Sequence, residues 1–258
     1  MSRTFVIGDI HGAYDALQQC LSRSDIDYRK DRLICLGDIC DRRTGVKDCV
    51  EELLKFKDLI MILGNHDQWA LEWMRSNSRP GIWLEQGGSQ TVESYQEGVP
   101  ETHVAFFTNA KFYHQEGGKL FVHGGIDPER PIDKQKEEDF LWDRSLVYMA
   151  LELNDPSRQL TQFKEVFVGH TPTISLNVRQ RFEKGRNFAK PHKIAKDTGS
   201  PRSPGRGSDI DGEQDPSALP MQFCNVWLMD TGAGWPTGRL SMMDVESGEI
   251  FQSDAIEE

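Results

Sequence analysis

Residues that commonly bind divalent metals recur in this sequence directly after short apolar runs. The set is Asp9 and His11 in FVIGDIHG, Asp38 in LICLGDICDR, Asn65 in LIMILGNHD, His123 in LFVHGG and His170 in VFVGHT. Carboxylates and imidazoles together suit Mn, Fe, Zn or Ni. Because one carboxylate can bridge two ions, these side chains are enough for two metals. Two ions about 3.5–4 Å apart can hold both oxygens of a phosphoryl displacement and lower the pKa of a bound water.

The apolar runs before these residues predict strands that are buried on both faces. Stretches with helical spacing of apolar residues follow the first three runs, at 13–21, 46–54 and 69–74. This alternation predicts an α/β sheet whose ligands gather beyond the carboxyl ends of the strands. Nearer the C-terminus, NVWLMDTGAG and GRLSMMDVESGEIFQSD predict further strands, with a hairpin turn at Glu246, Ser247 and Gly248.

Two stretches do not fit this alternation. Residues 75–118 are expected to form a small helical cap subdomain at the sheet edge. Residues 184–220 are rich in Gly, Pro and Ser and poor in apolar residues, which is typical of a flexible loop insertion. Both are expected to belong to one catalytic domain over residues 1–258, a length that fits a single large domain.

Composition limits the choice of partners. The net charge of −11 makes the protein a poor general binder of nucleic acid or of an anionic membrane surface. No apolar run reaches the length of a membrane span, and the first residues do not resemble a secretory signal. Five cysteines without Cys-x-x-Cys spacing are expected to be reduced thiols, which together with the missing signal predicts a cytoplasmic protein.

The motifs GDIHG, GDICDR, GNHD, HGG and GHT resemble, in order and approximate spacing, those of the phosphoprotein phosphatase family of binuclear metallophosphoesterases. The bacterial and bacteriophage Ser/Thr phosphatases are the most similar, because the third motif ends in Asp67. The resemblance runs from about Thr4 to the end, apart from the 184–220 stretch. It implies a β-sandwich of mixed sheets flanked by helices, in four layers α/β/β/α.

The resemblance also implies a role for each motif residue. Asp9 and His11 would hold a first ion, Asp38 would bridge, and Asn65, His123 and His170 would complete a second, with Mn as the expected metal.

Four further residues would act on the substrate. His66 would protonate the leaving group, and Asp41 would orient His66 and favour its protonated form. Arg42 and Arg144 would bind the phosphate oxygens, Arg144 through the looser motif FLWDRS.

These roles imply direct attack by a metal-bridging hydroxide, without a phosphoenzyme. The expected enzyme is a protein Ser/Thr phosphatase acting on a phosphorylated protein or a small phosphoester. The alternative is a diadenosine tetraphosphate hydrolase on the same fold; that group tends to have HAG at the fourth motif and to lack the Asp41–Arg42 pair. An inactive phosphopeptide-binding module would have lost a ligand or the acid, and all are present.

Other residues near the motifs have ordinary structural explanations. Arg43 stands where the family usually has Gly, and we expect it to point to solvent. Asp67 is expected to cap a helix and Trp69 to pack in the core. No cysteine has an arginine at the Cys-x5-Arg spacing of thiol phosphatases, so Cys35 and Cys40 are expected to take no part in the chemistry.

Overall fold

The computed structural model describes residues 2–155, 157–176 and 218–257, and within them the strands form two five-stranded sheets. The first has the order β10-β9-β1-β2-β3, with β1 Thr4–Ile7, β2 Arg32–Cys35, β3 Asp58–Met61, β9 Ser241–Asp244 and β10 Ile250–Gln252. The second has the order β4-β5-β6-β8-β7, with β4 Tyr113–Glu116, β5 Lys119–Val122, β6 Glu165–Val168, β7 Met221–Phe223 and β8 Val226–Leu228.

Each sheet has a parallel centre and antiparallel edges. In the first sheet β1, β2 and β3 are parallel, and β9 and β10 are added antiparallel through the predicted hairpin. In the second sheet β5, β6 and β8 are parallel, with β4 and β7 antiparallel at the two edges. The parallel centres gather the carboxyl ends of their strands at one end of each sheet, where loops can bring functional residues together.

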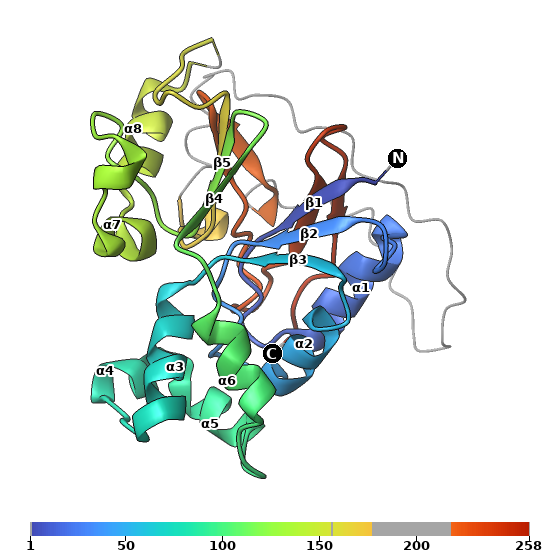
Figure 1. Ribbon diagram of the computed structural model, residues 1–258. Coiled ribbons are helices and arrows are strands. Elements are labelled where there is room, and N and C mark those ends of the chain that lie inside the picture. Colours follow the sequence, from blue (N-terminus) through green and yellow to red (C-terminus); the bar gives the residue numbers. More distant parts are fainter. Residues whose placement is uncertain (1, 156, 177–217, 258) are drawn as a thin grey trace.

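The predicted four-layer arrangement is confirmed. Alternation along β1 places Val6 in a core between the two sheets, together with Phe121 and Phe167 of the second sheet. The neighbouring Phe5 and Ile7 instead face a helix-covered core. A third core packs α7 and α8 on the outer face of the second sheet, so the layers run helix, sheet, sheet, helix (Figure 1).

The helices match the predicted periodicity. The helices over the first sheet are α1 Tyr14–Ser24 and α2 Val46–Leu53, while α3 Asn65–Ser76 lies beyond the end of that sheet (Figure 1). The helices on the second sheet are α7 Glu137–Trp142 and α8 Ser145–Leu153. Each of the first three has an acid in its first turn, Asp15, Asp48 and Asp67, where it complements the positive end of the helix dipole. Short 3-10 segments η2 Ile132–Lys134 and η3 Thr173–Ser175 lie in the connections.

The 75–118 stretch is helical in its first part and a strand at its end. After α3 come α4 Gly81–Trp83, the π-helical turn η1 Leu84–Gly88, α5 Ser89–Ser94 and α6 Glu101–Thr108, and then β4 joins the second sheet. Trp83, Tyr95 and Phe107 belong to the same buried cluster as α1 and α2. These helices therefore extend the helix-covered core of the first sheet, which contains Phe5 and Ile7, at one end of that sheet (Figure 1).

The other predicted segment lies almost entirely outside the described residues, which resume at Ala218. Within the described part of the chain, no helix is both long enough and apolar enough to cross a bilayer.

Candidate metal centre

The predicted ligands lie beyond the carboxyl ends of strands from both sheets. Asp9 follows β1, Asp38 follows β2, and Asn65 begins α3 after β3. His123 follows β5 and His170 follows β6 in the second sheet. All six predicted ligands except His123 line one cavity of about 190 Å³, and His123 is fully buried behind them. The structure thus brings the residues of five separate motifs to one place.

Two groups of donor atoms share Asp38. His11, Asp38 and His66 form one group and Asp38, His123 and His170 the other, with the ligand atoms of each group within 4.8 Å of one another. Asp38 Oδ2 lies 3.4 Å from His123 Nε2, 3.9 Å from His11 Nε2 and 4.0 Å from His66 Nε2. A carboxylate at this central place is suited to bridging two ions.

Backbone carbonyls set the orientation of two imidazoles. His11 Nδ1 lies 2.8 Å from the carbonyl oxygen of Cys40, and His123 Nδ1 lies 2.9 Å from that of Leu36. A carbonyl only accepts, so Nδ1 donates, and in the neutral ring Nε2 carries the lone pair. Both rings therefore present Nε2 to Asp38, which is how outer partners commonly orient metal-binding histidines.

The motif glycines allow the close approach of these side chains. A methyl group on Gly169 would overlap Asp9 Oδ1, and one on Gly64 would overlap Asp38 Oδ1. The ligand loops are also strained. Non-glycine residues with positive φ include His11 at 50°, Asp38 at 48° and His170 at 62°. Such strain persists where the surroundings hold a residue in a functional conformation.

Three carboxylates, those of Asp9, Asp38 and Asp230, are buried together in the cavity wall. Burial raises the pKa of Asp9 well above its ordinary value, helped by the charges of Asp230 and Asp38, and burial raises the pKa of Asp230 to about 6. Burial lowers the pKa of His11 to about 3, so that imidazole is in its neutral, ligating form. Asp230 Oδ2 and His170 Nε2 are buried without a hydrogen-bond partner. Divalent ions would stabilise the ionised form of the buried carboxylates and bind the two unpaired atoms, so the donor set fits them.

His66 and Asp41 form a buried pair beside the donor groups. His66 Nδ1 lies 2.6 Å from Asp41 Oδ2, which also accepts from Trp83 Nε1 at 2.8 Å. Asp41 Oδ1 accepts from the Thr91 hydroxyl at 2.6 Å. Burial lowers the pKa of His66, but the carboxylates of Asp38 and Asp41 outweigh it and the net shift is upward. The histidine is thus oriented with Nε2 toward the cavity and biased toward its protonated form.

Both predicted phosphate-binding arginines line the same cavity. The Arg42 guanidinium stacks 3.9 Å above the ring of Trp235, and its backbone N–H donates to Gly87 O at 3.0 Å. Arg144 Nη2 donates to the carbonyl of His170 at 3.2 Å. Arg42 Nε is buried without a partner. Two guanidiniums beside the donor groups can neutralise and orient a phosphate.

Comparison with known proteins agrees with this geometry. Residues 2–194 match the model of the family described as calcineurin-like phosphoesterase. The chain belongs to this family. It is therefore a metallophosphoesterase, a hydrolase that uses divalent metal ions, and its paired His and Asp groups are placed to hold them.

The chain is similar to enzymes that are named for two different kinds of substrate. A symmetrical bis(5'-nucleosyl)-tetraphosphatase of Pseudomonas fluorescens strain SBW25 is 24% identical over 96% of this chain and 93% of its own length. Serine/threonine-protein phosphatase 1 of Salmonella typhimurium strain LT2 is 36% identical, but over 33% of this chain and 38% of its own length. Matches to three further tetraphosphatases cover between 44% and 52% of those proteins.

A crystal structure of a protein described provisionally as a diadenosine tetraphosphatase shares the fold. It has a TM-score of 0.60 and 15% identity, covering 100% of this chain and 95% of that one.

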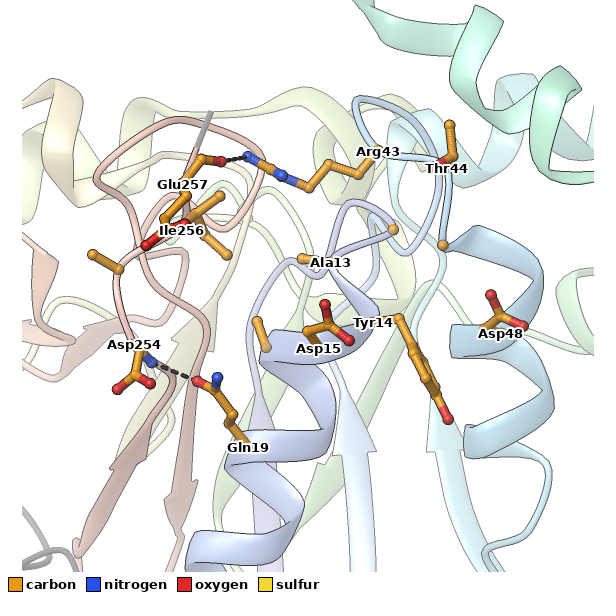
Figure 2. A pocket seen from close by; sticks show the side chains of 14 residues that line it. Ala13, Tyr14, Asp15, Gln19, Arg43, Thr44, Asp48, Asp254, Ile256 and Glu257 are labelled. Carbon is orange, nitrogen blue, oxygen red and sulfur yellow. Dashed lines mark hydrogen bonds between the residues drawn. The ribbon is translucent and has the colours of Figure 1, made fainter. Parts of the chain in front are cut away.

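Arg43 turns away from the metal cavity of this phosphoesterase. It lines a second cavity of about 600 Å³ near the starts of α1 and α2, and its Nη2 donates to the carbonyl of Glu257 at 2.8 Å (Figure 2). Asp254 N–H donates to Gln19 Oε1 on the other side of this cavity. Arg43 is partly buried by this contact rather than fully in solvent, and it tethers the C-terminal segment to the loop of Asp41 and Arg42.

Five residues of the cavity were not predicted as site residues, namely Gln86, Trp142, Pro172, Asp230 and Trp235. Asp230 had a detectable pattern, because it follows the apolar run VWLM directly, as Asp9 and Asp38 follow apolar runs with one glycine between. Asp67 does more than cap α3. Its Oδ1 accepts from the N–H groups of Ile39 and Cys40 at 2.9 and 3.1 Å, and its Oδ2 accepts from Gly64 at 3.1 Å.

The remaining histidines and cysteines have packing or surface roles in the described part of the chain. His103 is buried with Nδ1 2.9 Å from the Tyr95 hydroxyl, and His114 contacts Glu116. His192 lies outside the described residues. The cysteines are unpaired and buried, and burial raises the pKa of both Cys35 and Cys40, which keeps them as inert thiols.

Proposed function

We propose that this phosphoesterase hydrolyses dinucleoside polyphosphates, with diadenosine tetraphosphate as the representative substrate. Two donor groups that share Asp38 beside two arginines support hydrolysis of a phosphoryl bond. The nearly full-length likeness to a symmetrical tetraphosphatase supports the choice of substrate. The sequence motifs had favoured a protein Ser/Thr phosphatase, and the comparisons support the dinucleotide alternative better, because the likeness to a Ser/Thr phosphatase covers a third of the chain.

The proposed metal ligands divide between two ions. Asp9 and His11 would hold one ion and Asn65, His123 and His170 the other, with Asp38 between them. His11, Asp38, His123 and His170 belong to the two donor groups, and Asp9 and Asn65 line the cavity beside them. Bound divalent ions would neutralise the phosphate oxygens and lower the pKa of the attacking water. We propose Mn²⁺ for both sites, which metal analysis of the purified protein would test.

The other residues would bind the phosphate and move one proton. Arg42 and Arg144 would hold the non-bridging oxygens of the attacked phosphate. As the water oxygen bonds to phosphorus, the bridging P–O bond breaks and its electron pair goes to the leaving nucleoside diphosphate. His66 Nε2 would donate a proton to that oxygen while Asp41 keeps the ring in place. The attacking water would lose one proton to solvent, and His66 would regain one from solvent after the step. One diadenosine tetraphosphate and one water would thus give two molecules of ADP.

A second candidate is the phosphoserine and phosphothreonine monoesterase, and the His66–Asp41 pair favours it. A serine alkoxide is a far stronger base than a nucleoside diphosphate, so it depends more on a proton donor. An oriented, buried donor at 2.6 Å from its carboxylate would serve such a substrate well.

One assay separates the two candidates. Protein stripped of metal and reloaded with Mn²⁺ is given diadenosine tetraphosphate, a serine phosphopeptide and p-nitrophenyl phosphate in parallel. A kcat/KM that is highest for the dinucleotide, with ADP as product, supports the proposal. A preference for the phosphopeptide contradicts it and supports the monoesterase, whereas no turnover of any substrate contradicts both.

A further inference from the structure

An aromatic side chain in the wall of the cavity contacts the ring that packs against the proton donor. Trp142, the last residue of α7, lines the cavity, yet 36% of its surface is exposed. Asp41 binds Nδ1 of His66, so Nε2, which is 4.0 Å from Asp38 Oδ2, faces the cavity. A leaving oxygen that takes its proton from His66 must lie beside this nitrogen.

Trp69 connects the proton donor to Trp142. It follows His66 by one turn of α3, and the two rings meet edge to face at 5.4 Å and 85°. Trp69 and Trp142 meet at 5.0 Å and 65°, and Trp142 meets His170 at 5.9 Å and 89°. The indole is therefore held by aromatic contacts on two sides, while part of the residue stays exposed.

The backbone also fixes Trp142 relative to the metal centre. Gly124, next to His123, donates its N–H to Phe140 O at 2.6 Å. A methyl group on Gly124 would lie 2.9 Å from the backbone nitrogen of Trp142. The end of α7 therefore lies directly against the HGG loop. The close packing of α7 requires a glycine at position 124, the second residue of that motif. A surface held this firmly loses little freedom when it binds a ligand.

We propose that Trp142 is the stacking surface for the nucleobase of the leaving group. The identity of the leaving group, a nucleoside diphosphate, rests on the proposed function. The other indole of the cavity wall, Trp235, is stacked against Arg42, and most of the remaining wall presents carboxylates, imidazoles and two arginines, which suit phosphates and metal ions. An exposed indole at its edge suits a planar ring. Arg144, two residues after Trp142, would hold phosphate oxygens while the base stacks, so this short segment would recognise both halves of a nucleotide.

Product inhibition isolates the stacking contribution. The assay measures hydrolysis of p-nitrophenyl phosphate by the Mn²⁺-loaded full chain, with ADP or inorganic phosphate as the inhibitor. It compares the wild type with Trp142→Ala and Trp142→Phe. Trp142→Ala should raise the inhibition constant of ADP about tenfold and change that of phosphate by less than about twofold, with Trp142→Phe between. Tyr148→Ala is the matched control, because Tyr148 is 55% exposed on α8 and is not part of the cavity wall.

Two results would overturn the role of Trp142: an unchanged ADP constant, or equal weakening of ADP and phosphate. Trp142→Leu keeps apolar bulk against Trp69 without a ring and replaces the alanine variant if that variant does not fold. The proposed function fails separately. If the wild type cleaves no diadenosine tetraphosphate and still shows ADP inhibition that depends on Trp142, this result would contradict the proposed substrate and still support Trp142 as the stacking surface. Dinucleotide cleavage with the same kcat/KM in Trp142→Ala contradicts the stacking surface alone.

Discussion

The substitution Asp41→Asn should separate the charge of Asp41 from its shape. Asp41 is fully buried and accepts from His66 and Trp83 through one oxygen and from Thr91 through the other. An asparagine can keep its oxygen toward His66 and Trp83 and turn its amide toward Thr91, whose hydroxyl can accept. The fold is therefore expected to persist, while the negative charge that favours protonated His66 is lost.

The size of the effect follows from the change in hydrogen bond. A bond to a charged group contributes about 1.5–3 kcal/mol and a neutral one about 0.5–1.5 kcal/mol, so Asp41→Asn should remove about 1–2 kcal/mol of support for the protonated ring. This corresponds to about a 5- to 30-fold fall in kcat for a leaving group that needs the proton. A serine phosphopeptide should show this loss. The p-nitrophenolate group leaves without protonation, so kcat for its ester should change less than about threefold.

The assay compares kcat for the two substrates at saturating Mn²⁺ with metal content measured in the same samples. Glu52→Gln serves as control, since Glu52 is a buried carboxylate on α2 that is not part of the cavity wall. It should leave both rates unchanged. Equal losses for both substrates in Asp41→Asn would refute the reasoning, because the carboxylate would then act on the metals or the fold and not on proton donation.

Three further predictions follow from the same geometry. His66→Asn should lower kcat for the phosphopeptide about 100-fold or more while two metals stay bound, whereas loss of an ion by metal analysis would make His66 a ligand, as its grouping with His11 and Asp38 allows. Arg42→Ala should weaken inhibition by free phosphate at least about tenfold, since it removes a charged donor from the pocket, and an unchanged inhibition constant would exclude Arg42 from phosphate binding. Burial raises the pKa of Glu52, but hydrogen bonds from Lys55 and Tyr28 outweigh this effect and hold the folded-state pKa below the unfolded value. The stability that Glu52 contributes is therefore present above the unfolded-state pKa and is lost as the pH falls through the folded-state pKa. Glu52→Gln should cost about 1–2 kcal/mol in denaturant unfolding at pH 7 and progressively less below about pH 4, and a constant difference across this range would contradict the pairing.

The cavity that forms the candidate metal centre was predictable because it is built from strand ends. Each buried strand gives a strong apolar run, and the residue just beyond it, such as Asp9 or His170, can be identified without knowing the fold. Parallel pairing then brings those ends together. Asp230 follows the same rule after β8 and was missed because its strand had been interpreted only as part of an added sheet. The short edge strands β4 and β7 are polar or three residues long and give no such run.

Contacts between distant segments could not be predicted from the sequence. The acceptor role of Asp41 depends on Trp83 and Thr91, which lie 42 and 50 residues away. Trp142 and Trp235 look like ordinary core residues in sequence, and their place in the cavity wall depends on how α7 and the loop after β8 fold against the centre. Arg43 is similar, because the C-terminal carbonyl that binds it is 214 residues along the chain.

The central claim is a pair of divalent ions on either side of Asp38. Anomalous diffraction from crystals of the Mn²⁺-loaded protein, measured on both sides of the Mn absorption edge, tests it directly. The account predicts two peaks about 3.5–4 Å apart, one next to Asp9 and His11 and the other next to Asn65, His123 and His170. A single peak, or a pair of peaks away from Asp38, would contradict it.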